Sequence, residues 1–275
     1  MSLLQVTVLA VIQGFTEFLP ISSSAHLALA PWLLGWKDQG LAFDIALHLG
    51  TLAAVLVYFF RDWLQILAQG FGLRFGHDPE LKRNPTMLWL LALGSLPIGV
   101  LGYIFKEHAE TTLRSPYVIA TMLIAVAILM AAAERVSRRQ KTIEHVNTFD
   151  ALAIGIAQAL AIVPGTSRSG ITITAGLGRN LERSAAARFS FLLSTPAIVA
   201  AGAKAFYDLH KAGGVPPDMT VPFILGISLS AISGLAAIGF LMRYLRHASL
   251  HVFIYYRIVF GIIVFALAIL RSPAE

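Results

Sequence analysis

The long apolar stretches of the chain constrain its fold more than any other feature. Six of them approach the roughly 20 residues that a helix needs to cross a bilayer. They comprise residues 41–60, 86–105, 117–133, 189–207, 221–241 and 252–270. Only 13% of the residues are charged, against about 25% in a soluble domain, and the apolar runs are continuous where a membrane β-barrel would alternate. The sequence therefore excludes a soluble or disordered chain and predicts an all-α polytopic membrane protein.

Four further apolar segments are too short or too broken to cross a bilayer. They are residues 3–19, which stop at Pro20; 25–34, which stop at Gly35; 149–163, which stop at Pro164; and 169–177, which stop at Gly178. Two short helices joined by a polar turn predict a re-entrant hairpin, which is tolerated only where protein or a water-filled cavity covers it. The sequence thus predicts about six transmembrane helices and two re-entrant helical hairpins.

The two predicted hairpins resemble each other, which indicates an internal duplication. Residues 20–23 align with residues 164–167 at an offset of 144, and the same offset aligns Leu49, Thr51, Ala53 and Val55 with Leu193, Thr195, Ala197 and Val199. Each half would contain three spans, and because three is an odd number the two halves must have opposite orientations in the membrane. Inverted repeats with broken helices place a site near the midplane, where the broken helices meet. We expect one integral membrane domain over residues 1–275, with repeat halves of about 1–145 and 146–275.

The distribution of basic residues predicts the orientation. Residues 61–85, 134–150, 179–188 and 242–251 hold 13 Lys and Arg. The opposite side holds six: Lys37, Lys106, Arg114, Lys204, Lys211 and Arg271. The positive-inside rule places the first four segments in the cytoplasm and both termini outside. The net charge of +6 is explained by these loops, so we expect no nucleic-acid binding, and the absence of cysteine excludes thiolate chemistry.

The first hairpin carries a group of polar residues. Gln13 and Glu17 share a helix face, and an ionised glutamate in an apolar segment needs a partner, a metal ion or water. Ser22 or Ser23 is suited to cap the next helix. His26 would lie in its first turn, where the positive end of the dipole favours a neutral imidazole, and such an imidazole beside a hydroxyl suits base-assisted attack by serine. The alternative is that the serines only cap and that Glu17 forms a structural pair.

The second hairpin carries the run Pro164-Gly-Thr-Ser-Arg-Ser-Gly-Ile-Thr172. A turn containing Gly165 followed by a helix start exposes backbone N–H groups that bind anions. Ser167, Ser169 and Thr172 add hydroxyl donors, and Arg168 adds a planar fork that suits phosphate oxygens. This run predicts an anion-binding cradle. The alternative is a capped turn whose arginine reaches the lipid headgroups.

Two weaker signals remain open. Asp44, His48 and Thr51 share one helix face, where His48 could also bond only within the bundle. Arg257 lies in an apolar context and makes either a structural pair or a ligand contact. Combined with the two hairpins, these features suit hydrolysis of a phosphoryl ester or diphosphate on a lipid, in which Glu17 could hold Mg²⁺ or Ca²⁺ together with the substrate phosphates.

The sequence resembles the undecaprenyl-diphosphate phosphatase family of the bacitracin-resistance type. Residues 13–17, Gln-Gly-Phe-Thr-Glu, fit the first family motif, a Glu or Gln followed four residues later by Glu. Residues 164–172 fit the second, P-G-x-S-R-S-x-x-T, in full. Residues 18–26 and 43–50 are also similar to the family, so the resemblance spans essentially the whole chain.

The resemblance implies hydrolysis of undecaprenyl diphosphate to the monophosphate carrier, which is recycled for cell-wall synthesis in the bacterial cytoplasmic (inner) membrane. The pocket of the family opens toward the outer side. The family's functional residues correspond here to Glu17, Ser23, His26, Ser167, Arg168, Ser169 and Thr172. Because position 13 is Gln, this motif supplies only one carboxylate, so Gln13 would bind a metal through its carbonyl oxygen or orient water.

Our hypothesis makes Ser23 the nucleophile and gives its proton to His26. Glu17 orients a divalent metal ion or His26, and Arg168 with the second-motif hydroxyls holds the diphosphate. One alternative makes His26 the nucleophile. Another class of function is transport, either as a polyprenyl-phosphate flippase or as an anion transporter, which inverted repeats and re-entrant hairpins also serve. The sequence leaves the oligomeric state open, a homodimer included.

Overall fold

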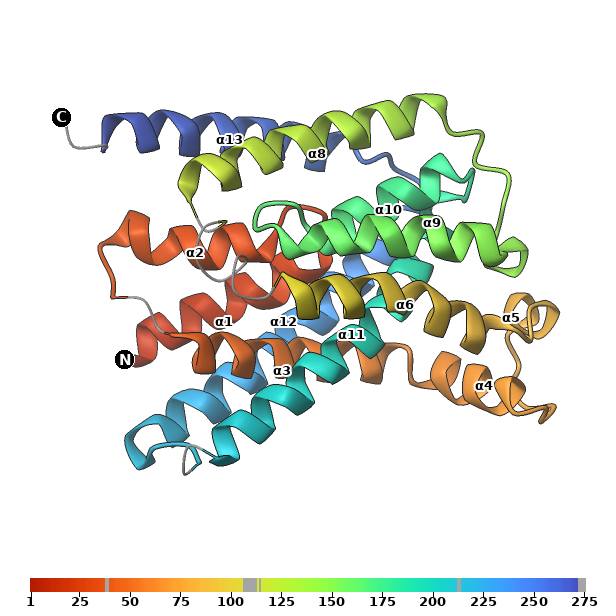
Figure 1. Ribbon diagram of the computed structural model, residues 1–275, viewed down its shortest axis with the longest axis horizontal. Helices are drawn as coiled ribbons and strands as arrows, with labels where there is room; N and C mark the ends of the chain where they lie inside the picture. Colours follow the sequence, from red (N-terminus) through yellow and green to blue (C-terminus); the bar gives the residue numbers. More distant parts are fainter. Residues whose placement is uncertain (38–39, 106–112, 114, 212–213, 272–275) are drawn as a thin grey trace.

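The computed structural model describes residues 1–37, 40–105, 113, 115–211 and 214–271, and the regular elements in these ranges are helical. Five of the described helices are long and apolar enough to cross a membrane, and a sixth span is counted if α3 (Leu41–Tyr58) and α4 (Phe60–Gly70), which are sharply bent relative to each other, are taken as one. The five are α6 (Met87–Ile104), α8 (Pro116–Val136), α11 (Arg183–Lys211), α12 (Thr220–Tyr244) and α13 (His251–Leu270). The prediction of an all-α polytopic membrane protein is confirmed (Figure 1).

The two short broken segments form helical hairpins. The first hairpin consists of α1 (Leu3–Phe18) and α2 (Ser23–Leu34). The second consists of α9 (Thr148–Ala159), a 3₁₀ turn (Leu160–Ile162) and α10 (Arg168–Gly178). Ser22 caps α2 by accepting from the Ala25 N–H, and Ser167 caps α10 by accepting from the Gly170 N–H. Both serines have a positive φ, 77° and 67°, so the same unusual cap begins the second helix of each hairpin.

The equivalent caps correct the predicted alignment of the two turns by one residue, while the alignment of residues 49–55 with 193–199 stays a prediction. The sequence aligned Ser23 with Ser167 at an offset of 144, whereas the caps pair Ser22 with Ser167. The reason is that the second turn has one more residue between its proline and its cap. Gly165 adopts a φ of 92° in this turn, and a Cβ there would lie 2.5 Å from the Ile119 carbonyl oxygen.

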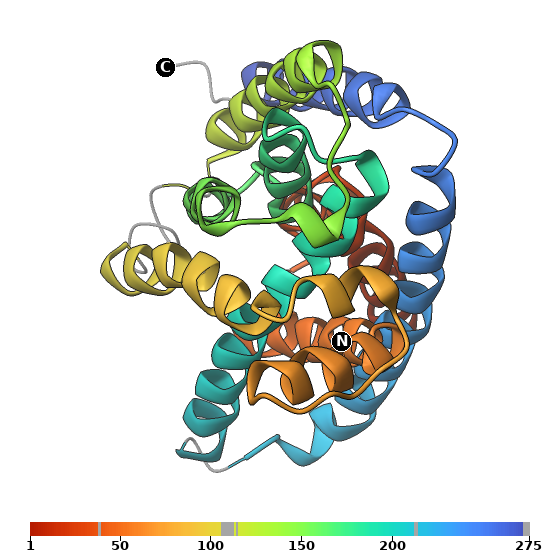
Figure 2. The same cartoon turned by 90° about the vertical axis from the view of Figure 1, so that its right-hand side faces the viewer.

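The first helix of each hairpin packs on a span from the other predicted half, α1 on α12 and α9 on α6. Glycines allow the close approach. A Cβ on Gly14 would lie 2.7 Å from the Ser230 carbonyl oxygen, and a Cβ on Gly155 would lie 2.2 Å from the Gly94 carbonyl oxygen. Seen along the long axis, α13 and α12 curve around one side of the molecule, outside the hairpins (Figure 2). Because each hairpin packs on a span of the other half, the two hairpins lie in the interior. The boundaries of the repeat halves stay a prediction.

Two boundaries differ from those predicted. The span expected to end at residue 60 is followed by α4, which is bent by 73° from α3. The expected loop over residues 61–85 therefore contains α4 and the short helix α5 (Pro79–Arg83). Gln65 of α4 holds this segment by hydrogen bonds to both the N–H and the carbonyl of Asp78. The helix α11 begins six residues earlier than expected, because the basic residues of its first turns are satisfied by ion pairs.

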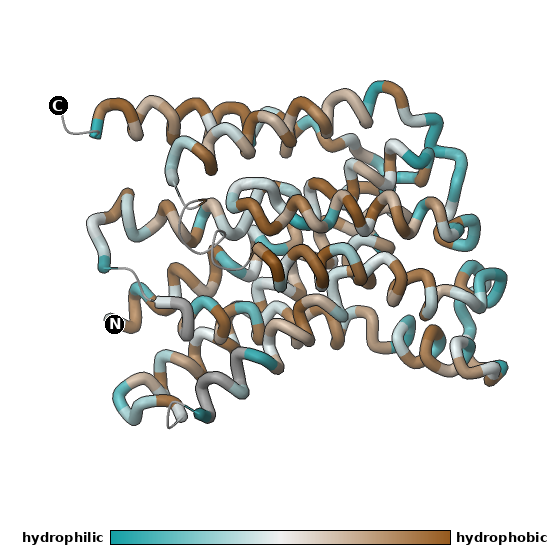
Figure 3. Tube along the Cα trace, viewed as in Figure 1, coloured by the Kyte–Doolittle hydropathy of each residue, from teal (hydrophilic) through white to brown (hydrophobic). Residues whose placement is uncertain are grey.

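The four segments predicted to be cytoplasmic lie together at the end of the molecule opposite both termini (Figure 1). Five ion pairs link the first three segments: Arg83–Glu144, Arg183–Glu134, Arg179–Asp150, Arg188–Asp62 and Arg188–Asp78. Two more, Arg139–Glu134 and Lys141–Asp150, lie within the segment 134–150. Figure 3 shows hydrophilic residues concentrated at the ends and apolar residues along the helices between them. Of the six basic residues predicted for the opposite side, Lys106 and Arg114 lie outside the described residues.

Candidate active site

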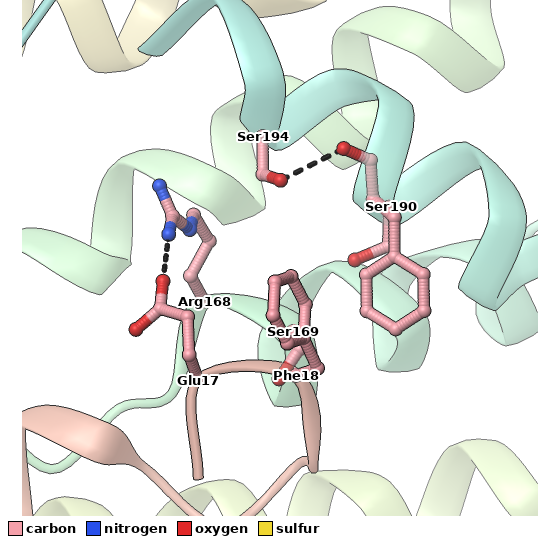
Figure 4. A pocket seen from close by; sticks show the side chains of 7 residues that line it. Glu17, Phe18, Arg168, Ser169, Ser190 and Ser194 are labelled. Atoms are coloured by element: carbon pink, nitrogen blue, oxygen red, sulfur yellow. Dashed lines mark hydrogen bonds and ion pairs between the residues drawn. The ribbon is translucent and has the colours of Figure 1, made fainter. Parts of the chain in front are cut away.

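The tips of the two hairpins touch in the interior. The Arg168 guanidinium of α10 forms a charged hydrogen bond with the Glu17 carboxylate of α1 (Figure 4). The Ser169 hydroxyl donates to the Leu19 carbonyl oxygen at 3.1 Å, and the Gly165 N–H donates to the Ser24 hydroxyl oxygen at 3.3 Å. Glu17 and Arg168 are 151 positions apart in the sequence. The sequence motifs predicted that their charged groups lie together, and the structure confirms this contact.

Glu17 is the centre of a hydrogen-bond network. Only 7% of its surface is exposed. Its Oε2 accepts from the Ser23 hydroxyl at 2.6 Å and from Gln13 Nε2 at 3.0 Å. His48 Nε2 lies 3.7 Å from the same oxygen. Because a buried charge is tolerated when it is paired and hydrogen-bonded, these partners explain how a carboxylate is held at membrane depth.

His26 lies in the first turn of α2 as predicted, but its ring does not bond to Ser23 in the described network. Its Nδ1 lies 2.7 Å from the Ser22 carbonyl oxygen, and its Nε2 lies 2.6 Å from the Tyr256 hydroxyl. The Ser23 hydroxyl instead donates to Glu17, since an ionised carboxylate is the stronger acceptor. The expected contact between hydroxyl and imidazole is thus replaced by one between hydroxyl and carboxylate.

The hydroxyls of the second motif are turned mainly toward the protein. Ser167 caps α10, and its Oγ lies 3.3 Å from the Ser169 hydroxyl. The Thr172 hydroxyl donates to the Arg168 carbonyl oxygen at 2.7 Å and lies 2.5 Å from the Ser190 hydroxyl. These contacts fix the start of α10. The Arg168 guanidinium, by contrast, faces the first hairpin, where it pairs with Glu17.

A small polar cavity of about 10 Å³, with room for about one water molecule, lies beside the ion pair. It is lined by Glu17, Phe18, Arg168, Ser169, Ser190, Phe191 and Ser194 (Figure 4). Sequence reasoning missed Ser190 and Ser194. A signal for them was available, because they lie four residues apart in an apolar span and therefore share one helix face. Polar side chains in a membrane helix point to the interior of the bundle.

Arg257 joins the two hairpins through their backbones. Its side chain is fully buried. It donates to the carbonyl oxygens of Pro20 at 3.3 Å, Gly165 at 2.9 Å and Thr166 at 3.1 Å. Two more donations reach carbonyls of α8, at Met122 and Leu123. Of the two roles that the sequence left open, the structure therefore shows the structural one.

Of the weaker set on α3, His48 reaches the site. Its Nδ1 lies 2.7 Å from the Asp44 carbonyl oxygen, which leaves Nε2 toward Glu17. The Thr51 hydroxyl is buried and donates to the His48 carbonyl oxygen at 2.9 Å. Thr51 is thus a structural residue of the helix.

The oxygen donors available for a metal ion are few. The described residues contain no group of three or more His, Asp and Glu that could hold a metal ion. Glu17 is the single carboxylate in the site, and the buried Oε1 of Gln13 has no hydrogen-bond partner. One carboxylate and one amide oxygen fit the preference of Mg²⁺ and Ca²⁺ for oxygen ligands, provided that substrate phosphates and water complete the shell.

A family model described as bacitracin resistance protein BacA matches residues 6–263. The chain belongs to the BacA family. It is 44% identical over 272 residues to an undecaprenyl-diphosphatase of Pelotomaculum thermopropionicum, with 99% of each chain covered. It is 45% identical to that of Moorella thermoacetica, covering 98% of this chain and 100% of the relative, and 47% identical to undecaprenyl-diphosphatase 2 of Stutzerimonas stutzeri, covering 97% and 98%. The family membership inferred from residues 13–17 and 164–172 is therefore confirmed over nearly the whole chain.

Proposed function

We propose that this chain is an undecaprenyl-diphosphatase, a membrane hydrolase that removes the terminal phosphate of undecaprenyl diphosphate. The products are inorganic phosphate and the monophosphate lipid carrier for cell-wall synthesis. The observation that carries the proposal is the contact of Glu17 with Arg168 at the meeting point of the two hairpins, beside a polar cavity. The full-length relatives that bear this enzyme name support it.

Arg168 is the proposed anchor for the diphosphate. In the described arrangement Glu17 satisfies the guanidinium. Phosphate oxygens are equally suited to its planar fork, so an incoming diphosphate competes with Glu17 for Arg168. Binding of substrate would then release the carboxylate for its own role, while the Ser167 and Ser169 hydroxyls and the Gly165 turn lie at the start of the same helix.

Ser23 remains the proposed nucleophile, and the hydrogen bond of 2.6 Å makes Glu17 the acceptor of its proton. The serine oxygen forms a bond to the terminal phosphorus, and the bond from that phosphorus to the bridging oxygen breaks, which releases the lipid monophosphate. Water then hydrolyses the phosphoserine. A nucleophilic His26 is the second candidate, and the acid stability of a trapped phosphoenzyme separates the two because a phosphoramidate hydrolyses in acid.

A divalent ion is the proposed cofactor. Mg²⁺ or Ca²⁺ held by Glu17 and Gln13 with the substrate phosphates would neutralise part of the diphosphate charge. We further propose that the protein resides in the bacterial inner membrane and that the site opens to the outer side, as the excess of basic residues at the opposite end supports.

The test is phosphate release from undecaprenyl diphosphate by purified protein in detergent, where no gradient exists. Arg168→Ala should remove nearly all of the activity, whereas Arg246→Ala, which changes an exposed arginine at the distant charged end, should retain it. An Arg168→Ala variant that keeps most of its rate would contradict the anchor. Lipid binding without phosphate release by the unmodified protein would favour the flippase or transporter instead.

A further inference from the structure

The helix α13 brings a tyrosine to the active-site histidine from 230 residues away. The Tyr256 hydroxyl lies 2.6 Å from His26 Nε2. The two rings are nearly parallel, with centroids 5.8 Å apart, and Phe260 stacks on the imidazole at 4.7 Å. His26 is therefore held by a hydrogen bond at each nitrogen and by an aromatic ring against its face.

These contacts determine which nitrogen of His26 carries the proton. The partner of Nδ1 is the Ser22 carbonyl oxygen, which can only accept, so Nδ1 must donate. In a neutral imidazole the other nitrogen is then an acceptor. The Tyr256 hydroxyl donates to it, which completes a chain of two hydrogen bonds of fixed direction.

The neighbouring residue on α13 ties the same region together. Arg257 holds the turns of both hairpins at Pro20 and Gly165, while Tyr256 holds the side chain of His26. Arg257 is fully buried, whereas 41% of the Tyr256 surface is exposed. The phenol therefore lies at the open edge of the assembly, where it can exchange His26 for another partner.

We propose that Tyr256 is a positioning residue of the active site, which holds His26 as the neutral Nδ1–H tautomer with Nε2 as its reacting nitrogen. This inference rests on the proposed function in the form that makes His26 the nucleophile, the second candidate named above. Nδ1 is occupied by its proton and by the Ser22 carbonyl oxygen, so His26 must attack the terminal phosphorus through Nε2. The substrate reaches that nitrogen by replacing the Tyr256 hydroxyl.

The first test measures the chemical reactivity of His26. Diethyl pyrocarbonate modifies the free lone pair of a neutral imidazole, and mass spectrometry of the full-length protein in detergent gives the rate at each histidine. Tyr256→Phe keeps both ring contacts and removes only the hydroxyl, so His26 should be modified several-fold faster. Tyr255→Phe is the matched control, because Tyr255 is exposed and its ring stacks on His251; it should leave His26 unchanged.

The second test measures catalysis by the same variants. Loss of the group that orients a nucleophilic His26 should lower kcat by roughly tenfold with KM nearly unchanged, since misplacement of a reacting group by about 1 Å can cost about 10²-fold. An unchanged modification rate in Tyr256→Phe would show that the contact is absent in solution and overturn the proposal. Faster modification with unchanged kcat would equally overturn it. Failure of the proposed function is distinguishable, because the unmodified protein would then release no phosphate while the modification rates still differ.

Discussion

Replacement of Arg257 by lysine tests the architecture of the site most directly. The change keeps the positive charge but replaces a planar fork with a point charge. Three guanidinium nitrogens of Arg257 donate to five carbonyl oxygens, three of them in the hairpin turns. The Met122 and Leu123 carbonyls lie within α8 and keep their helical N–H partners. The three turn carbonyls are served by two separate guanidinium nitrogens, which a single ammonium nitrogen replaces, so we expect at least one buried turn carbonyl to lose its partner.

The expected cost follows from these numbers. A buried polar group that loses its partner costs about 1–3 kcal/mol, so one such group lowers the free energy of unfolding by that amount. For a chain of this size, 1 kcal/mol corresponds to roughly 2–4 °C in the midpoint, which predicts a loss of roughly 2–12 °C. Arg257→Met should cost at least as much, because it removes all five donations.

The assay is the apparent melting temperature in detergent, followed by size-exclusion chromatography at one fixed heating rate, since membrane proteins commonly unfold irreversibly. Phosphate release by the folded fraction is measured in parallel and should also fall, because the hairpin turns lose their common anchor. Arg246→Lys, an exposed change, is the control. The reasoning is refuted if Arg257→Lys melts within about 2 °C of the unmodified protein, less than 1 kcal/mol on the same scale, with its full rate of phosphate release.

Three further predictions concern packing, the metal ion and orientation. Gly155→Ala should lower the melting temperature by several degrees, because its Cβ would lie 2.2 Å from the Gly94 carbonyl oxygen and only movement of α9 away from α6 relieves the clash; unchanged melting would contradict the packing. Chelation should abolish phosphate release, and Mg²⁺ or Ca²⁺ should restore it, whereas full activity in the chelator would remove Glu17 and Gln13 as metal ligands. The chain has no cysteine, so Lys37→Cys should react with an impermeant maleimide on intact spheroplasts and Arg246→Cys only after lysis; the opposite pattern would invert the orientation.

The secondary structure of the membrane region could be predicted because its causes are local. Apolar length determines a span, and a proline followed by a capping serine ends one helix and starts the next. The helix α4 was missed because Arg61 and Asp62 interrupt the apolar run, so that the sequence after it predicted a loop. The alignment of the two turns was one residue out because it was anchored on Pro20 and Pro164, and the second turn has one more residue before its capping serine.

The candidate site was predicted where charge in an apolar segment is itself the signal. Glu17 and Arg168 are costly in such surroundings unless they are paired or bind a ligand, so their juxtaposition followed from two motifs. The partner of the Ser23 hydroxyl, the role of Arg257 and the presence of Tyr256 did not follow. The first depends on the turn between α1 and α2, and the other two depend on which face of α13 meets the hairpins.

The amino-acid sequence by itself therefore determined the helices, the hairpins and the charges that need one another, because each of these follows from the cost of leaving a polar group in lipid. The tertiary structure alone decided the partners of the hydrogen bonds, Glu17 for the Ser23 hydroxyl and His26 for the Tyr256 hydroxyl. The physical reason is that a hydrogen bond requires two groups within about 3 Å. The hairpin turn sets that distance in the first case, and the packing of distant helices sets it in the second.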